Sequence, residues 1–101
     1  MDIPYKSEEE NGVKNTFRCV LREYMADRLF RARREMDLTQ AKFAELVMMD
    51  TRSYVSLEHG ENLCCTLTFI VYLVFLCKDP EGLIKDLRKV LLESIGRHEQ
   101  K

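Results

Sequence analysis

Hydrophobic residues recur every three or four positions along most of this chain, which is the spacing of one face of an α-helix. Five segments follow this pattern, and none shows the strict alternation of hydrophobic and polar residues that is typical of a strand. We therefore expect an all-α protein. The expected helices cover residues 17–36, 40–47, 51–59, 67–78 and 80–95.

Residues that satisfy free backbone groups mark the ends of these helices. A side-chain oxygen just before a helix can accept a hydrogen bond from a backbone N–H of the first turn. Gly60 suits the position after the third helix, where a positive φ is favoured, and Gly96 is expected to end the last one. The expected N-terminal caps are Asn15 or Thr16, Thr39, Asp50, Thr66 and Asp79.

The two short helices have clear inward faces. Phe43, Ala44 and Val47 share one side of the second helix, and Tyr54 and Leu57 form an i, i+3 pair on the third. The fourth helix is apolar on nearly every face and must therefore be buried on nearly every face. At roughly 18 Å it is too short to span a membrane.

If Tyr54 and Leu57 face the core, the polar residues of the third helix point outward. These residues are short or basic and can hydrogen-bond, as required of a helix that reads base edges in the major groove. Gln40, at the start of the preceding helix, can offer its amide and its backbone N–H to a phosphate. The outward residues are Thr51, Arg52, Ser53 and Ser56.

A specific pattern links this stretch to a known family. The residues that carry it are Leu29, Arg33, Leu38-Thr39-Gln40, Phe43-Ala44, Ser53-Tyr54, Leu57-Glu58 and Gly60. With these residues the chain resembles the helix-turn-helix domain of Cro and phage-repressor proteins over about residues 22–78. The resemblance implies a five-helix lambda-repressor-like fold with an extra C-terminal helix. It also implies a bacterial, sequence-specific DNA-binding transcriptional regulator that acts as a homodimer on double-stranded DNA.

The resemblance assigns a role to each outward residue. Gln40 matches a phosphate-contacting position, Thr51 and Arg52 match base-reading positions, Ser53 matches a backbone contact and Ser56 matches a further groove-facing position. Arg33 and Glu58 match a partly buried ion pair between the first and third helices. An acid near a helix C-terminus is unfavourable unless it is paired, and arginine can pair with it through two hydrogen bonds. We expect an Arg33–Glu58 contact.

Three positions depart from the family pattern. Met48 stands at a turn position usually held by glycine, and Asp50 caps the third helix where serine or threonine is common. Loop 61–65 lacks the basic residue that often holds the DNA backbone, and it contains Glu61. We therefore expect weak non-specific binding, with about 3–5 phosphate contacts per dimer.

Composition and charge agree with one small domain. The chain has 101 residues, 46% hydrophobic and 33% charged, with a net charge of −1. We expect a mobile N-terminal tail over residues 1–13, with a net charge of −3, and a domain over residues 14–96. Residues 14–60 have a net charge of +2, so an anion-binding surface is expected there.

The remaining residues favour a binding protein in the cytoplasm. No secretory signal or membrane span is expected, and Cys19 and Cys77 are expected to be buried, reduced thiols. A redox switch at Cys64-Cys65 is a minor alternative. No metal-ligand spacing, phosphate-binding loop or nucleophile–base set is present, so we expect no metal, no cofactor, no small-molecule substrate and no enzyme activity.

The excess of apolar residues in the fourth helix leaves two interpretations open. One is a homodimer interface, because large exposed apolar patches are rare on monomers. The other is an internal cover formed by the first and fifth helices. For function, the alternative to a DNA-binding regulator is a protein–protein adaptor, or an antitoxin, that keeps the fold with weak or no DNA binding.

Overall fold

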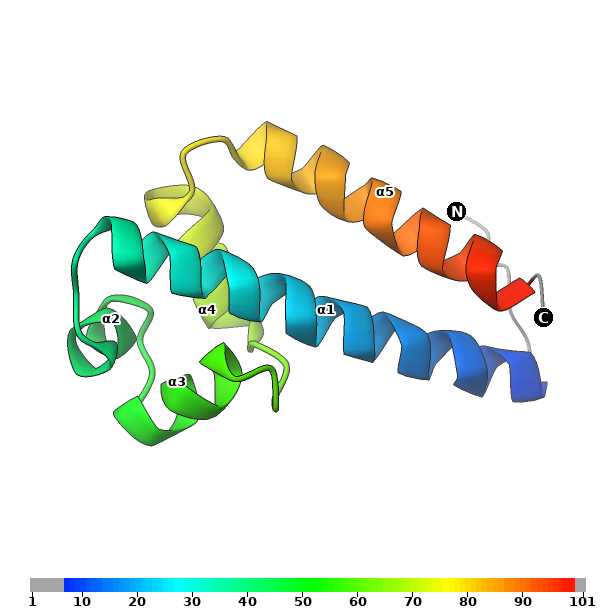
Figure 1. Cartoon of the computed structure of the whole chain (residues 1–101), viewed down its shortest axis with the longest axis horizontal. Coiled ribbons are helices and arrows are strands. Elements are labelled where there is room, and N and C mark those ends of the chain that lie inside the picture. Colours follow the sequence, from blue (N-terminus) through cyan, green and yellow to red (C-terminus); the bar gives the residue numbers. More distant parts are fainter. Residues whose placement is uncertain (1–6, 100–101) are drawn as a thin grey trace.

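The computed structural model describes residues 7–99 and is all-α, as expected (Figure 1). The described part of the chain contains no strand. The elements are α1 (Ser7–Glu35), α2 (Gln40–Leu46), α3 (Thr51–Glu58), α4 (Thr66–Val71), the π-helical segment η1 (Tyr72–Leu76) and α5 (Pro80–Glu99). None of the described helices combines the length and the apolarity that crossing a membrane requires.

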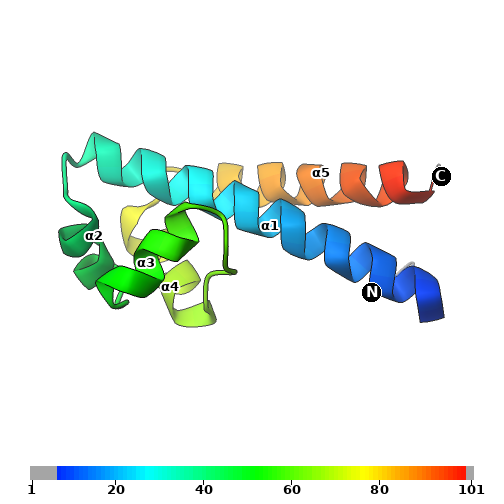
Figure 2. The same cartoon turned by 60° about the horizontal axis from the view of Figure 1, so that its bottom comes forward.

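Two long helices and a cluster of short ones make up the molecule. The two long helices, α1 and α5, pack side by side and run in opposite directions, and α2, α3 and α4 gather near the C-terminal half of α1 (Figures 1 and 2). The N-terminal half of α1 and the C-terminal half of α5 extend beyond this cluster. The α2–α4 cluster is thus placed at one end of an elongated protein.

The core lies between α1 and the short helices. All five residues expected on the inward faces of α2 and α3 are buried, which confirms those predictions. Leu29 of α1 is fully buried among them, and the rings of Phe43 and Tyr54 lie 5.4 Å apart between centroids. Large apolar side chains from three helices therefore fix the position of α3 against α1.

Helix α1 begins ten residues earlier than the pattern predicts. The expected tail over residues 1–13 is wrong from Ser7 onward, while residues 1–6 lie outside the described residues. Thr16 is not a cap but an interior residue, whose hydroxyl donates to the carbonyl oxygen of Gly12 at 2.9 Å. A serine followed by Glu8-Glu9-Glu10 is also a helix-start sequence, because carboxylates favour the positive end of the helix dipole.

Asp86 of α5 contacts α1 through two hydrogen bonds. Its Oδ2 atom accepts hydrogen bonds from Tyr24 Oη at 2.8 Å and from Arg28 Nη2 at 3.1 Å. The helix begins as expected, with the N–H of Gly82 donating to Asp79 Oδ1 at 3.1 Å. It does not end at Gly96 but continues to Glu99, because a glycine inside a helix costs only about 1 kcal/mol.

The fourth helix differs from its prediction at both ends. The N-cap is Cys65 rather than Thr66, and it makes no side-chain capping hydrogen bond. The single helix expected over residues 67–78 ends at Val71, and the chain continues as η1. Its inward contact with α2 is a hydrogen bond from Thr68 Oγ1 to the carbonyl oxygen of Val47 at 2.9 Å.

The cysteine expectations are only partly met. Cys77 is half-buried, but Cys19 is exposed, so its predicted burial is wrong. Cys19 lies in the N-terminal half of α1, away from the residues of this helix that enter the core. All four cysteines are free.

Candidate nucleic-acid interface

The outward face of α3 is positioned by capping at the start of both short helices. The Thr39 hydroxyl accepts a hydrogen bond from the N–H of Lys42 at 3.2 Å and begins α2. The Asp50 carboxylate accepts one from the N–H of Ser53 at 3.0 Å and begins α3. Both predicted caps are confirmed. The direction of each short helix is therefore fixed at its first turn.

The turn between α2 and α3 is left-handed at Met48. The φ of this residue is 61°, a region that is unfavourable by about 1–2 kcal/mol for a residue with a Cβ atom. The turn is closed by a hydrogen bond of 2.9 Å from the N–H of Met49 to the carbonyl oxygen of Ala44. The turn thus adopts the conformation for which glycine is favoured, even though methionine occupies the position.

The side chains of three residues, one each from α1, α2 and α3, donate hydrogen bonds to the Glu58 carboxylate. Glu58 Oε2 accepts hydrogen bonds from Arg33 Nε at 2.7 Å and Tyr54 Oη at 2.6 Å. Glu58 Oε1 accepts from Arg33 Nη2 and Gln40 Nε2, both at 3.0 Å. The side chains of Arg33 and Glu58 are only 14% and 5% exposed. The predicted ion pair is confirmed, and it joins α1, α2 and α3.

Hydrogen bonds within this network stabilise the charged forms of Glu58 and Arg33. Burial alone would raise the pKa of Glu58, but the hydrogen bonds from Arg33, Tyr54 and Gln40 outweigh it and hold that pKa below its usual range. The hydrogen bond to Glu58 raises the pKa of Arg33. Burial, and then the same carboxylate, raise the pKa of Tyr54. Near neutral pH the cluster is therefore a carboxylate, a guanidinium and a neutral phenol.

Sequence reasoning did not identify two members of this network. Tyr54 precedes Glu58 by four residues, so the two lie on one helical face, and this spacing was the available signal. Gln40 was expected to offer its side-chain amide and its backbone N–H to a phosphate, and in the structure the amide nitrogen donates one hydrogen bond to Glu58. The Gln40 side chain thus positions α2 against α3, and its contact with a phosphate stays a prediction.

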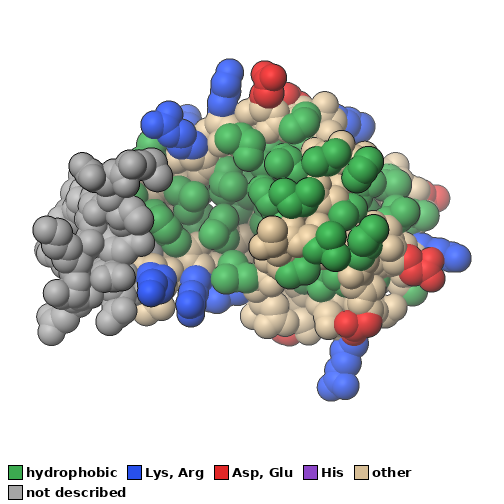
Figure 3. Space-filling model, turned by 180° about the vertical axis from the view of Figure 1, so that it is seen from behind, with side chains coloured by type: hydrophobic (Ala, Val, Ile, Leu, Met, Phe, Trp, Pro, Cys, Tyr) green, Lys and Arg blue, Asp and Glu red, His purple; other side chains and the backbone are tan. Residues whose placement is uncertain are grey.

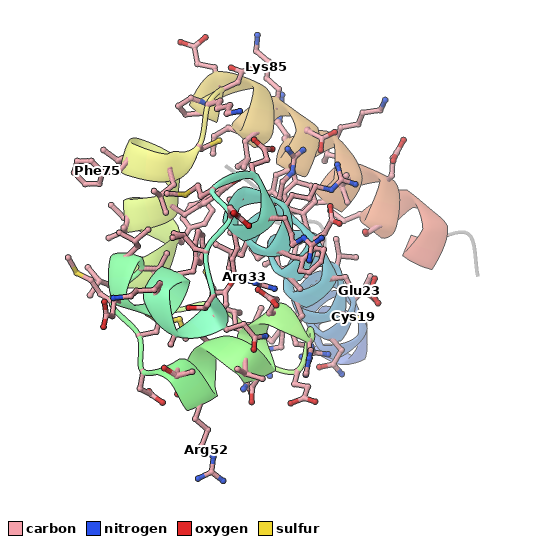
Figure 4. All side chains as sticks on the ribbon, turned by 60° about the vertical axis from the view of Figure 1, so that its left-hand side comes forward. Cys19, Glu23, Arg33, Arg52, Phe75 and Lys85 are labelled. Carbon is pink, nitrogen blue, oxygen red and sulfur yellow. The ribbon has the colours of Figure 1, made fainter. Side chains whose placement is uncertain are left out.

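Most of the expected reading face is open to solvent. Thr51, Arg52 and Ser53 are exposed, and the Arg52 side chain extends away from the body of the protein (Figure 4). Ser56, one turn further along, is only half-buried rather than fully outward. The accessible part of this face is thus the first turn of α3.

Charges of both signs are exposed on α2, on α3 and on the residues that flank α3. Lys42 and Arg52 are exposed cations, and Glu45, Asp50 and Glu61 are exposed acids. The backbone N–H of Ser53 lowers the pKa of Asp50, so this carboxylate remains charged near neutral pH. The surface is therefore not a strongly positive patch, although Arg52 extends from it into solvent (Figure 4).

No metal site accompanies this face. Within the described residues, no group of three or more His, Cys, Asp and Glu side chains is arranged to hold a metal ion. Comparison of the chain with protein-family models, curated proteins and solved structures finds no match. A function must therefore be argued from the residues of this chain.

Proposed function

We propose that this protein is a sequence-specific DNA-binding transcriptional regulator of the bacterial cytoplasm, a binding protein rather than an enzyme. The observation that carries the proposal is the first turn of α3. It exposes Thr51, Arg52 and Ser53 together, and it is held from behind by the Glu58 network. A short helix that presents hydrogen-bonding side chains at its N-terminal end can enter a major groove and contact base edges.

The rigidity of α3 supports this proposal. A side chain that distinguishes bases must be held on a well-positioned element, because a bidentate contact with guanine depends on geometry. Arg33 and Gln40 attach α3 to two other helices through Glu58. Arg52 is thereby carried on a fixed scaffold while its own guanidinium is free to contact a base.

A dimer is part of the proposal. Two copies related by a two-fold axis present two α3 helices to half-sites about 34 Å apart. Such a dimer controls transcription by occupancy, since it blocks or recruits polymerase at its site. A single α3 with one extended arginine offers few contacts, so high affinity requires both halves.

Selection from a random DNA library, followed by fluorescence anisotropy, tests the proposal. We expect an enriched two-fold symmetric site that binds better than random DNA. Arg52→Ala should weaken binding to the selected site by about 10–100-fold and relax the base preference at one position in each half-site. Arg88→Ala removes an exposed arginine of α5 and serves as the matched control. If no sequence outcompetes random DNA, the proposal is wrong.

The salt dependence of binding provides a second measurement. Phosphate contacts release counterions, with a slope of log K against log salt of about −0.9 per contact. The mixed charges around α3 support few contacts, so we expect a slope of roughly −3 to −4.5 for the dimer. A slope near zero would contradict a phosphate-contacting surface.

The second candidate function is a protein–protein adaptor or an antitoxin. The exposed acids Glu45, Asp50 and Glu61 favour it, because carboxylates on α2 and at both ends of α3 repel phosphate. An adaptor would show no salt-dependent DNA binding and would capture one protein in stoichiometric amounts. An antitoxin would bind both such a protein and DNA.

A further inference from the structure

An uncommon change of helix type lies in the middle of the most apolar segment of the chain. Thr68, Val71 and Tyr72 point into the core from α4 and the start of η1. In a continuous α-helix the next inward position would be residue 75, because inward positions recur every three or four residues. Residues 72–76 instead form a π-helical turn, whose i to i+5 hydrogen bonds include one of 2.8 Å from Cys77 N–H to Tyr72 O.

Because of the π turn, Leu76 rather than Phe75 faces the core. Leu76 is half-buried and packs against the core, whereas Phe75 is 76% exposed. A wider turn needs an extra residue, so the inward position shifts from 75 to 76. A π turn is rare and is frequently found at functional sites. Here it turns a phenylalanine from the core toward solvent.

Phe75 is one of four large apolar side chains that α4 and η1 expose to solvent. Four neighbouring side chains of α4 and η1, which we call the apolar face, are exposed at Leu67 (53%), Ile70 (45%), Val74 (60%) and Phe75 (76%). Leu67, Ile70 and Val74 lie at i, i+3 and i+7, on one side of this segment, and the extra residue of the π turn rotates Phe75 toward that side. The side of the molecule opposite to that of Figure 1 shows a broad hydrophobic surface (Figure 3).

We propose that the apolar face is a two-fold interface with a second copy of this chain, and that Phe75 is its central anchor. This inference deepens the proposed function. It rests on that function in one respect, because binding to paired half-sites on DNA requires two copies of the chain. The existence of the interface, however, is argued from the apolar face alone and is measured without DNA.

The absence of charge on this segment favours a second copy as the occupant. Residues 62–77 include no Asp, Glu, Lys, Arg or His. In a two-fold interface each residue near the axis faces its own copy, so a charge there would repel itself. A different protein partner could match a charge with its opposite, but a self-complementary surface must avoid charges at its centre. The apolar face satisfies this requirement.

The area also fits a dimer. Interfaces of standard size bury about 800 Å² per partner, of which about 65% is apolar in homodimers. The exposed parts of the four side chains amount to roughly 400 Å², which supplies most of that apolar share. The polar residues around them can supply the rim.

The apolar face leaves the reading face free. Phe75 and Arg52 both extend from the body of the protein, but on different sides of it (Figure 4). The hydrogen bond from Thr68 to Val47 connects α4 to the end of α2, just before the turn that leads to α3. Contact through Phe75 can therefore position two α3 helices without covering either of them.

Sedimentation velocity of the full chain from about 1 µM to about 1 mM tests the interface. We expect wild type to dimerise and Phe75→Asp to weaken dimerisation by at least about 100-fold, because the carboxylates would face each other near the axis. Val74→Lys is a second variant with the same expectation. Leu92→Asp, at a side chain of α5 that is 54% exposed, is the matched control and should dimerise like wild type.

Each result has a defined meaning. Circular dichroism must show that the variants keep the helical content of wild type, and high exposure of the replaced side chains makes this the expected result. A wild-type protein that stays monomeric throughout the range overturns the inference. So does dissociation by Leu92→Asp alone, which would place the interface on α5. A dimer that depends on Phe75 but selects no DNA sequence supports the interface and refutes only the DNA-binding proposal.

Discussion

Replacement of Glu58 by glutamine tests whether the buried network fixes α3. The Glu58→Gln change keeps the size of the side chain but replaces one of its two acceptor oxygens with an NH₂ group. Each oxygen accepts two hydrogen bonds in wild type, one of which comes from Arg33. The variant therefore loses two hydrogen bonds and leaves the Arg33 guanidinium without its counter-ion.

The size of the effect follows from the burial of the pair. Removing one partner of a buried ion pair destabilises a protein by about 3–5 kcal/mol. We expect about 3 kcal/mol, the lower end, because Arg33 Nη1 keeps its hydrogen bond of 2.9 Å to the carbonyl oxygen of Leu38. In a domain of this length that loss lowers the unfolding midpoint by roughly 10–20 °C.

Thermal and urea unfolding at pH 7, followed by circular dichroism, measure the difference. Glu35→Gln is the matched control, because Glu35 pairs with Lys78 on the surface, where both side chains are more than half exposed. This control should unfold like wild type. The effect of Arg33→Met should also be smaller in the Glu58→Gln background than in wild type, since the pair is already broken. An unfolding midpoint of Glu58→Gln equal to that of wild type would refute the role of the network.

Three further measurements test the Glu58 network, the turn at Met48 and the contact of Thr68. The pKa of Glu58 is lowered from its ordinary value of 4.5, so the stabilisation that its charge provides is fully present above pH 4.5. This stabilisation is lost as the pH falls through the pKa of the folded state. In urea unfolding, the difference in stability between wild type and Glu58→Gln should therefore shrink below pH 4.5. Met48→Gly should stabilise the protein by about 0.5–1 kcal/mol in urea unfolding, because relief of the left-handed backbone strain exceeds the entropy cost of glycine. Met49→Gly is the control and should destabilise the protein. Thr68→Val should destabilise the protein by about 1–2 kcal/mol in urea unfolding, since it removes the buried hydrogen bond to Val47; a neutral result would show that this bond does not hold α4 to α2.

Local signals in the sequence were sufficient for the short helices. The caps at Thr39 and Asp50, the inward residues of α2 and α3 and the positive φ of 76° at Gly60 were all predicted and found. Each of these features depends on residues within one turn of it. Periodicity and capping report on such short distances directly.

Features set by long-range packing were not predictable in the same way. Gln40 and Glu58 are 18 positions apart, and nothing local to Gln40 indicates that its amide meets that carboxylate. The contact exists only because Phe43 and Tyr54 hold α2 and α3 together in the core. A glutamine at a helix start can serve either a phosphate or a neighbouring side chain, and tertiary packing decides which.

The π turn could not be predicted from the sequence for a different reason. Residues 67–77 are apolar on nearly every face, so no periodicity distinguishes inward from outward positions. Once the structure fixes Val71 and Tyr72 in the core, the exposure of Phe75 requires the extra residue that a π turn provides. The sequence could indicate excess apolar surface, but not which residue carries it.

The two proposed surfaces are coupled through the same backbone. Glu58 holds α3 to α1, and Thr68 holds α4 to the last residue before the Met48 turn. If two copies meet at Phe75, these contacts leave α3 little freedom to adjust its position relative to the dimer axis. The interface would then set the distance between the two reading helices, and with it the spacing of the half-sites. Thr68→Val loosens one of these two contacts without altering either surface. It should therefore broaden the range of half-site spacings that selection recovers, while Arg52→Ala should leave the spacing unchanged and alter only the preferred bases.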